Sequence, residues 1–155
     1  MDNYSNYSLS LLRNSRHTMK KHAIRRGSSE YHEQRDHDLF CAYKQAFTRK
    51  DLSNERDTVR AAIKSPTPRF YVSEERAVRV VNQWMTDGCP PRMLPMQRMM
   101  YDEIVRRVRE MQRQQPRERI NRLVWEVISQ PAPQFYLTEK SAYVILNRIK
   151  KKSVC

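Results

Sequence analysis

The sequence predicts an all-α protein made of two tandem three-helix units, and three observations support this prediction. Glycine, which weakens helices, occurs twice in 155 residues, whereas the helix-favouring residues Arg, Glu, Gln, Met and Leu are abundant. Apolar residues recur with helical spacing in several segments, and most of the eight prolines fall between those segments. The chain also repeats itself, which indicates an internal duplication.

The repeated segment reads Ser-Pro-Thr-Pro-Arg-Phe-Tyr-Val-Ser at residues 65–73 and Gln-Pro-Ala-Pro-Gln-Phe-Tyr-Leu-Thr at residues 130–138. The offset between the copies is constant at 65 residues, and residues 59–84 match residues 124–149 at nine positions without a gap. Each Pro-x-Pro removes backbone donors and disfavours the α conformation of the residue before a proline. It is therefore expected to end the preceding helix in both copies.

Two features of the repeated segment follow its prolines. A hydroxyl residue before a glutamate, Ser73 in the first copy and Thr138 in the second, is typical of a helix start. The aromatic residues between the prolines and these starts are Phe70, Tyr71, Phe135 and Tyr136. We expect core aromatics that hold the connection in place, and stacking on a nucleic-acid base is the alternative.

Residues 1–29 are expected to form a flexible basic arm. They contain one acidic residue, Asp2, against six basic residues: Arg13, Arg16, Lys20, Lys21, Arg25 and Arg26. They hold too few large apolar residues to bury the surface that ordering requires. The functional interpretation is a tail that contacts phosphates, and the alternative is a terminus that only improves solubility.

The first unit, residues 30–86, is expected to contain helices at about 30–49, 55–64 and 73–85. The last of these helices has an apolar stripe at i, i+3, i+4 and i+7, formed by Ala77, Val80, Val81 and Trp84. Its opposite face carries Arg76, Arg79 and Gln83. The unit thus ends in a helix with a basic and amide-bearing outer surface.

A proline-rich linker, residues 87–96, separates the first unit from the second, residues 97–155. The second unit repeats the plan with helices at about 96–114, 117–129 and 138–152. Its middle helix has a wide apolar face of Ile120, Leu123, Val124, Val127 and Ile128. The same three-helix design is therefore expected twice.

Charge and missing motifs narrow the class of function. The net charge is +13 and the sequence pI is about 10.1, as expected for a protein that binds polyanions. The chain has no glycine-rich phosphate loop, HExxH, GxSxG or paired CxxC motif. We therefore expect a non-enzymatic protein without catalytic residues or cofactors.

Cysteine and histidine give no sign of a metal site. Glu33, His37 and Cys41 share one helix face, but we expect solvated charges beside a buried cysteine there. Three widely spaced cysteines, Cys41, Cys89 and Cys155, favour a reducing compartment. With neither a membrane-spanning apolar run nor a signal-peptide core, a cytoplasmic protein with no membrane partner is expected.

Our leading hypothesis is a nucleic-acid-binding protein with two helix-turn-helix-like units, and we expect DNA rather than RNA. In this interpretation the third helix of each unit reads base edges, while other Lys and Arg side chains hold phosphates. The candidate residues are Arg69, Arg76, Arg79, Gln83, Arg106, Arg107, Lys140, Arg148 and Lys151, with Lys20, Lys21, Arg25 and Arg26 of the arm.

Two alternatives stay open. About eight residues separate the second and third helices, whereas a helix-turn-helix uses three or four, so the phosphate contacts could instead lie on residues 106–113. The other class is a helical adaptor or structural protein, phage- or ribosome-associated, that binds a protein partner or a second copy. The methionines around the linker support that class, although we expect them instead to fill the seam between the units.

Overall fold

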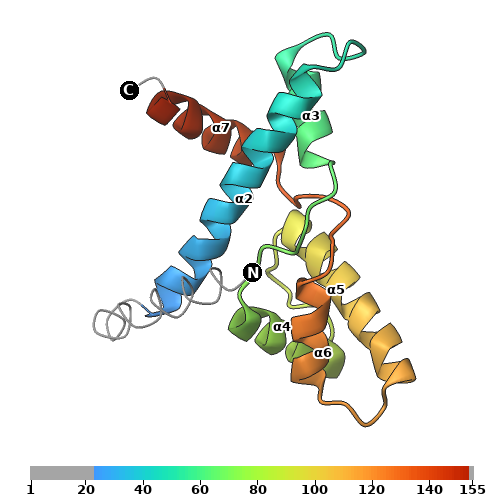
Figure 1. Cartoon of the computed structure of the whole chain (residues 1–155). Coiled ribbons are helices and arrows are strands. Elements are labelled where there is room, and N and C mark those ends of the chain that lie inside the picture. The colour runs from blue at the N-terminus through green and yellow to red at the C-terminus, as the bar shows by residue number, and fades with distance from the viewer. Residues whose placement is uncertain (1–22, 154–155) are drawn as a thin grey trace, which may run out of the picture.

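The computed structural model describes the backbone of residues 23–153 and the side chains of residues 31–152. In this part of the chain every regular element is a helix, which confirms the all-α prediction (Figure 1). The helices are α2 (Ala23–Phe47), α3 (Glu55–Ile63), α4 (Glu74–Asp87), α5 (Pro95–Gln114), α6 (Ile120–Ile128) and α7 (Glu139–Ser153).

The starts of α4 and α7 follow from the repeated segment. Ser73 Oγ accepts a hydrogen bond of 3.2 Å from the N–H of Arg76 at the start of α4. Thr138 Oγ1 accepts one of 3.2 Å from the N–H of Ser141 at the start of α7. Because first-turn amides have no partner within the helix, these hydroxyls stabilise both helix starts.

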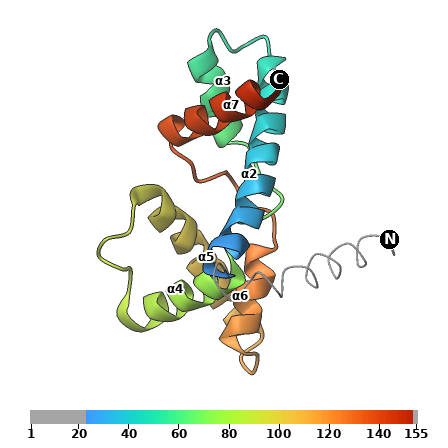
Figure 2. The ribbon, with the colours of Figure 1, turned by 90° about the vertical axis from the view of Figure 1, so that its left-hand side faces the viewer.

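The helices pack in two groups, and neither group is one of the two expected units, which would be α2–α3–α4 and α5–α6–α7. One group contains α2, α3 and α7, and the other contains α4, α5 and α6 (Figures 1 and 2). The sequence analysis expected each third helix to pack on the two helices before it. Instead α4 packs on α5 and α6, and α7 packs on α2 and α3. The two halves of the described chain have therefore exchanged their third helices.

Each group has its own apolar core. The core of the α2–α3–α7 group is Leu39, Tyr43, Val59, Ala62, Ile63, Phe135, Ala142, Ile145 and Leu146. The core of the α4–α5–α6 group is Phe70, Val72, Ala77, Val80, Val81, Tyr101, Ile104, Val105, Val108, Leu123, Val124, Val127, Ile128 and Ala132. Fully burying a Val, Leu, Ile or Phe side chain stabilises the fold by roughly 1.5–3 kcal/mol. Both cores combine residues from before and after the linker, so each half of the chain completes the core of the other.

The exchange takes place where two connectors, residues 64–73 and 129–138, cross. Thr67 and Ala132 form an antiparallel bridge in which each N–H donates to the other residue's carbonyl oxygen at 2.9 Å. These two positions are themselves 65 residues apart. The bridge therefore lies at the centre of the crossing.

A second pair of hydrogen bonds repeats this symmetry. The N–H of Phe70 donates to the carbonyl of Ile128, and the N–H of Phe135 donates to the carbonyl of Ile63, both at 3.0 Å. In the first bond the donor belongs to the first copy and the acceptor to the second, and in the other bond these roles are reversed. A local twofold axis therefore relates the two connectors. Because the prolines prevent the second helix from continuing, each connector leaves its own second helix and leads to a third helix that packs in the other group.

Helix α2 belongs to one group and also reaches the other. It has 25 residues, and its C-terminal half supplies Leu39 and Tyr43 to the first core. Its N-terminal half carries Tyr31, His32 and Arg35, which border a cavity together with residues of α4 and α5. This reach positions side chains of α2 against the second group.

Candidate nucleic-acid interface

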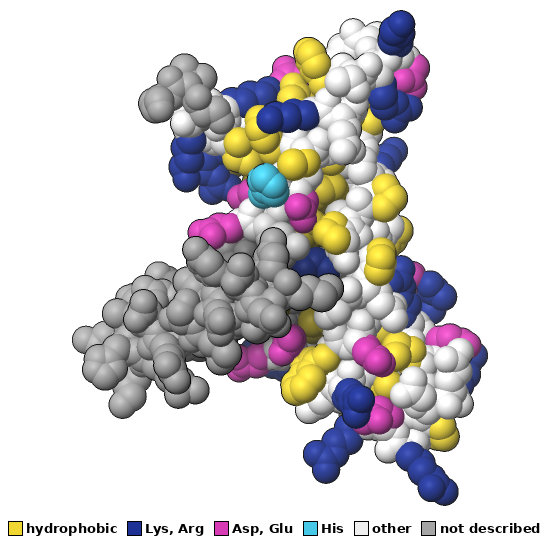
Figure 3. All heavy atoms as spheres, viewed as in Figure 1, with side chains coloured by type: hydrophobic (Ala, Val, Ile, Leu, Met, Phe, Trp, Pro, Cys, Tyr) yellow, Lys and Arg dark blue, Asp and Glu magenta, His cyan; other side chains and the backbone are white. Residues whose placement is uncertain are grey.

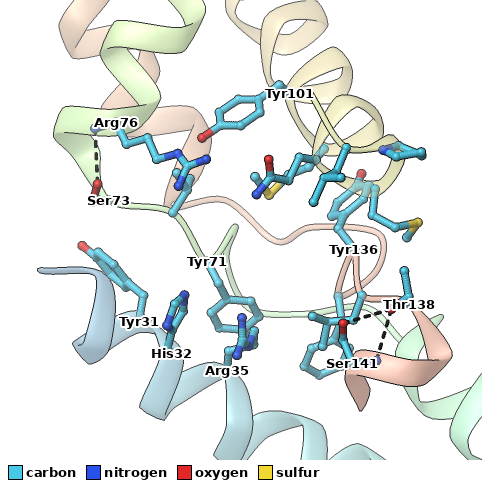
Figure 4. A pocket seen from close by; sticks show the side chains of 18 of the residues that line it. Tyr31, His32, Arg35, Tyr71, Ser73, Arg76, Tyr101, Tyr136, Thr138 and Ser141 are labelled. Carbon is cyan, nitrogen blue, oxygen red and sulfur yellow. Dashed lines mark hydrogen bonds between the residues drawn. The ribbon is translucent and has the colours of Figure 1, made fainter. Parts of the chain in front are cut away.

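A cavity of about 700 Å³ lies between the two helical groups. It is bordered by α2, by both connectors and by the first turns of α4, α5 and α7. Figure 4 shows Arg76 and Tyr31 on one side, Tyr136 and Thr138 on the other, and Tyr71 between them. The cavity is thus built from segments that are far apart in the chain and that only the helix exchange brings together.

Three arginines line this cavity: Arg35 of α2 and Arg76 and Arg79 of α4. Arg35 forms an ion pair with Asp36 at 3.0 Å. Arg76 and Arg79 are exposed, and neither forms an ion pair with a carboxylate of the described residues. Glu75 is the one acidic side chain that borders the cavity within the described part of the chain. The cavity therefore has an excess of positive charge.

The titration of His32 reflects this excess. Partial burial lowers the pKa of His32, and the charges of Arg35, Arg148 and Arg76 lower it further, whereas Asp36 opposes them. Because the pKa lies below its ordinary value of 6.5, the imidazole is mostly neutral at pH 7. The guanidinium groups, and not His32, supply the positive charge of the cavity.

The floor of the cavity contains two stacked aromatic pairs. Tyr71 stacks on Phe135 with ring centroids 5.9 Å apart, and Tyr136 stacks on Phe70 at 6.1 Å. Both phenylalanines are buried, whereas both tyrosines are half-buried and line the cavity. The two pairs are related by the 65-residue offset, so the aromatic floor obeys the same local symmetry as the connectors.

The phenols of Tyr71, Tyr101 and Tyr136 are neutral at physiological pH. Burial raises the pKa of Tyr71, and the hydrogen bond that its hydroxyl donates to Asp38 at 2.6 Å raises it further. Burial also raises the pKa values of Tyr136 and Tyr101, although Arg76 opposes the rise at Tyr101. The cavity therefore combines positive charge with uncharged aromatic surface.

Tyr136 has an unusual backbone conformation. Its φ angle is 55°, in the left-handed region that bulky residues rarely adopt. Such a conformation costs of order 1–3 kcal/mol and is found preferentially at functional sites. Among the described residues it is the single non-glycine residue with a positive φ. The strain occurs at the cavity wall.

Four of the predicted basic residues lie at or beside the cavity. Arg76 and Arg79 line it, and Lys140 borders a neighbouring shallow depression together with Arg35. Arg148 forms an ion pair with Asp36 of α2 at 3.1 Å, and its charge acts on His32 at the cavity. The structure therefore brings together candidates that the sequence analysis assigned to different units.

Two predicted residues near the connectors have structural partners. Arg69 lies over the Tyr31 ring, 3.9 Å from its centroid, and donates to the carbonyl of Phe70 at 3.1 Å. Arg107 forms an ion pair with Glu103 at 2.8 Å and donates to the carbonyl of Pro131 at 2.8 Å. Both arginines brace a connector, which is a role that charge alone did not suggest.

The remaining predicted residues lie away from the cavity or outside the described side chains. Arg106 is exposed and paired with Glu103, while Gln83 and Lys151 are exposed on α4 and α7. Lys20 and Lys21 lie outside the described residues. Arg25 and Arg26 fall in the first turn of α2, but their side chains also lie outside the described part.

The sequence analysis missed Tyr31, His32 and Arg35. Their spacing of i, i+1 and i+4 places them on one helix face, which is the signal that the sequence contained. The spacing does not reveal which elements this face of α2 lies opposite. It faces α4 and α5 across the cavity only because the third helices are exchanged between the groups.

The outer surface carries its basic residues in separate places. On the face shown in Figure 3, Lys and Arg side chains gather over α7 and at the two far ends of the molecule. Lys150 of α7 forms an ion pair with Glu55 at 3.2 Å, and its ammonium also lies over the Tyr43 ring. Part of this surface charge is therefore already engaged within the protein.

Neither a metal centre nor a membrane segment is found in the part of the chain that the structure describes. No three His, Cys, Asp or Glu side chains of residues 31–152 are grouped to hold a metal ion. His37 and Cys41 are neighbours, with 3.7 Å between Nε2 and Sγ, and both are exposed, so the expectation of a buried cysteine was wrong. None of the described helices combines the length and apolar character needed to cross a membrane.

No protein-family model, curated protein or solved structure matches this chain.

Proposed function

We propose that this protein is a small, non-enzymatic nucleic-acid-binding protein whose contact surface is the cavity between the two helical groups. One observation supports this most directly: Arg35, Arg76 and Arg79 line a concave surface on which Glu75 is the single acidic side chain among the described residues. Guanidinium groups bind phosphate oxygens through paired hydrogen bonds. A polyanion is thus the partner that this surface fits.

Electrostatics favours a partner at this place. Arg76 and Arg79 repel each other and lack carboxylate partners among the described residues, so a bound phosphate would relieve the repulsion. The first turns of α4 and α7 also border the cavity, and a helix N-terminus carries a partial positive charge. The overall charge of +13 would add long-range attraction for any nucleic acid.

The proposed mode of binding differs from a helix-turn-helix. In that motif two consecutive helices pack across a short turn, whereas here α3 and α4 do not pack on each other, and neither do α6 and α7. A cytoplasmic DNA-binding role remains our expectation, but the contacts are proposed to come from the cavity and its rim. Gln83 and Lys151 would then lie outside the main contact.

We also infer that the chain arose by duplication of one half. Support comes from positions 65 residues apart that play equivalent roles: the hydrogen bonds of Phe70 and Phe135 have the same length and interchanged partners. Leu39 and Ile104 are buried in corresponding places of the two cores. According to this inference, each half of the chain encodes three helices, and each helical group combines two helices from one half with the third helix of the other half.

Salt-dependent binding tests the proposal. Binding of labelled duplex DNA, single-stranded DNA and structured RNA would be followed by fluorescence anisotropy over a range of salt concentrations. The doubly substituted Arg76→Ala/Arg79→Ala protein should bind more weakly, with a log–log salt slope that is smaller by roughly 1.4–1.8. The slope should fall because two phosphate contacts no longer release counterions.

The matched control is the Arg109→Ala/Arg117→Ala protein. It loses the same charge from exposed positions that do not border the cavity. If both double variants weaken binding equally, general charge and not the cavity determines affinity. If the wild-type protein binds none of the three nucleic acids, the proposal is wrong.

A helical adaptor that binds protein is the second candidate. Leu94, at the rim of the cavity, is 66% exposed, and such an apolar side chain beside a concave surface suits a peptide partner. Binding that does not change with salt, or capture of a protein partner that Leu94→Ser abolishes, would favour this class over nucleic acid.

A further inference from the structure

We propose that the cavity holds unpaired nucleotides of a single strand, with phosphates on its α4 wall and a base against its α5 and connector wall. This inference rests on the proposed nucleic-acid binding and names the form of nucleic acid. It follows from three properties of the cavity: the different character of its two walls, its size and its aromatic floor.

The two walls differ although the local twofold axis relates their positions. Arg76 lines the α4 side, and the residue 65 positions later, Ser141, lines the opposite side. Arg35 of α2 lies beside Ser141 and Leu137, and the residue 65 positions after it is Met100, which lines the α5 side. Figure 4 shows Arg76 and Ser141 on opposite sides of the cavity. Although the connectors are related by a local twofold axis, the lining is therefore unequal: α4 and α2 supply arginines, whereas the residues that α5 supplies are uncharged.

The α5 side of the cavity is strongly apolar. Leu94, Met96 and Met100 come from the start of α5, and Leu137 comes from the second connector. A ligand that fits both walls must carry negative charge on one edge and a flat or apolar group on the other. A nucleotide has this division, with its phosphate on one side and its base on the other.

The size of the cavity excludes a duplex from its interior. A volume of about 700 Å³ is in the range of cavities that enclose a small ligand. In duplex DNA the base faces are stacked inside the helix, and only base edges are offered in a groove roughly 12 Å wide. A base can enter this cavity only if it is unpaired.

The tyrosines provide surfaces on which a base can stack. Tyr136 and Tyr71 each place one side of the ring against a buried phenylalanine, and each also lines the cavity. The phenylalanine fixes the ring plane, so little side-chain entropy would be lost when a base stacks on it. The unusual backbone conformation of Tyr136 holds its ring at the same wall as the methionines.

The test uses the full-length protein and three labelled ligands of equal length, about 12 nucleotides each. These are an oligothymidine strand, an abasic phosphodiester strand and a blunt duplex of mixed sequence. We expect the oligothymidine strand to bind roughly tenfold more tightly than either of the other ligands, because only it offers both phosphates and free bases. All titrations are made at the same salt concentration.

Two variants test the stacking surface. Tyr136→Leu should lower affinity for oligothymidine roughly tenfold and leave the weak affinity for the abasic strand unchanged. Tyr143→Leu is the control, because Tyr143 is a half-buried tyrosine of α7 that does not border the cavity. Equal losses from both variants would overturn the proposal.

A photocrosslink tests the contact without depending on the stability of a variant. A strand that carries 5-iodouracil should crosslink to the peptide that contains Tyr136 or to the one that contains Tyr71. Crosslinks confined to peptides that do not border the cavity would overturn the proposal.

The outcomes separate this inference from the proposed function. Duplex binding as tight as single-strand binding, or equal binding of the abasic and oligothymidine strands, would refute the single-strand inference and leave nucleic-acid binding standing. Absence of binding to all three ligands would refute both.

Discussion

Thr67 and Ala132 each donate a backbone hydrogen bond of 2.9 Å to the other, and this bridge joins the two connectors where they cross. Thr67 Oγ1 also donates to the carbonyl of Arg69 at 2.8 Å, so every polar group of this buried residue contributes to the crossing. Two helical groups that would otherwise be separate are therefore linked at one buried point.

The crossing predicts that the two groups unfold together. Each core contains a helix from the other half of the chain, so neither core can open without displacing a connector that the other core needs. Trp84 and Trp125 belong to the α4–α5–α6 group, so tryptophan fluorescence reports that group, whereas far-ultraviolet circular dichroism reports both. We expect the two signals to give one coincident urea transition. Separate midpoints would show that the groups are independent.

Phe70 and Phe135 should be nearly equivalent in stability. Each is buried in one core, and each stacks on the tyrosine of the other connector. Phe70→Leu and Phe135→Leu should each lower the free energy of unfolding by about 1–2 kcal/mol. Phe47→Leu is the control, since Phe47 is 69% exposed and the change should stay within about 0.5 kcal/mol. A large difference between the two core variants, measured by urea denaturation, would contradict the equivalence.

The helices were predictable because local chemistry determines them. Apolar periodicity, the prolines and the hydroxyl residues Ser73 and Thr138 act within a few residues of each helix end. Three of the four residues predicted for the α4 stripe, Ala77, Val80 and Val81, are buried, and the fourth, Trp84, is partly buried against the same core.

The partner of each stripe could not be predicted, because the stripes of α4 and α7 are apolar in the same way and suit either group. Val80 and Ile145 occupy corresponding places, and nothing in their side chains distinguishes their own half from the other half. The cavity depends on this choice, so Arg35 and Arg76 could not be brought together from the sequence. The expectation of core aromatics was closer, because Phe70 and Phe135 are buried while the tyrosines beside them line the cavity.

Arg107 should contribute to stability far more than its neighbour Arg106. Both pair with Glu103, but the Arg107 side chain is 23% exposed against 68% for Arg106. Arg107 also donates to the carbonyl of Pro131 at 2.8 Å. Arg107→Ala should therefore lower the free energy of unfolding by about 1–2 kcal/mol, because a connector carbonyl loses a charged donor. Arg106→Ala should have little effect, as expected for an exposed ion pair. Equal effects in urea denaturation would show that the contact with the connector is unimportant.

Glu103 should make stability depend on pH in the acid range. Hydrogen bonds from Arg106 and Arg107 lower the pKa of Glu103 below its ordinary value of 4.5, although partial burial opposes the shift. Because the pKa is lower in the folded state than in the unfolded state, the contribution of Glu103 is fully present above about pH 4.5 and is lost as the pH falls through the folded pKa. Glu103→Gln should therefore reduce stability near neutral pH and flatten the loss of stability below about pH 4.5.

The measurement for Glu103 is the urea midpoint at several pH values between about 3 and 6, compared with wild type. Glu126→Gln is the matched control, because Glu126 is exposed on α6 and forms no ion pair within the described residues. For that control the urea midpoint should fall with decreasing pH as it does for wild type. If Glu103→Gln loses stability at low pH in the same way as wild type, the ion pairs of Glu103 with Arg106 and Arg107 do not couple protonation to folding. The stabilising role of Arg107 must then come from its contact with Pro131 alone.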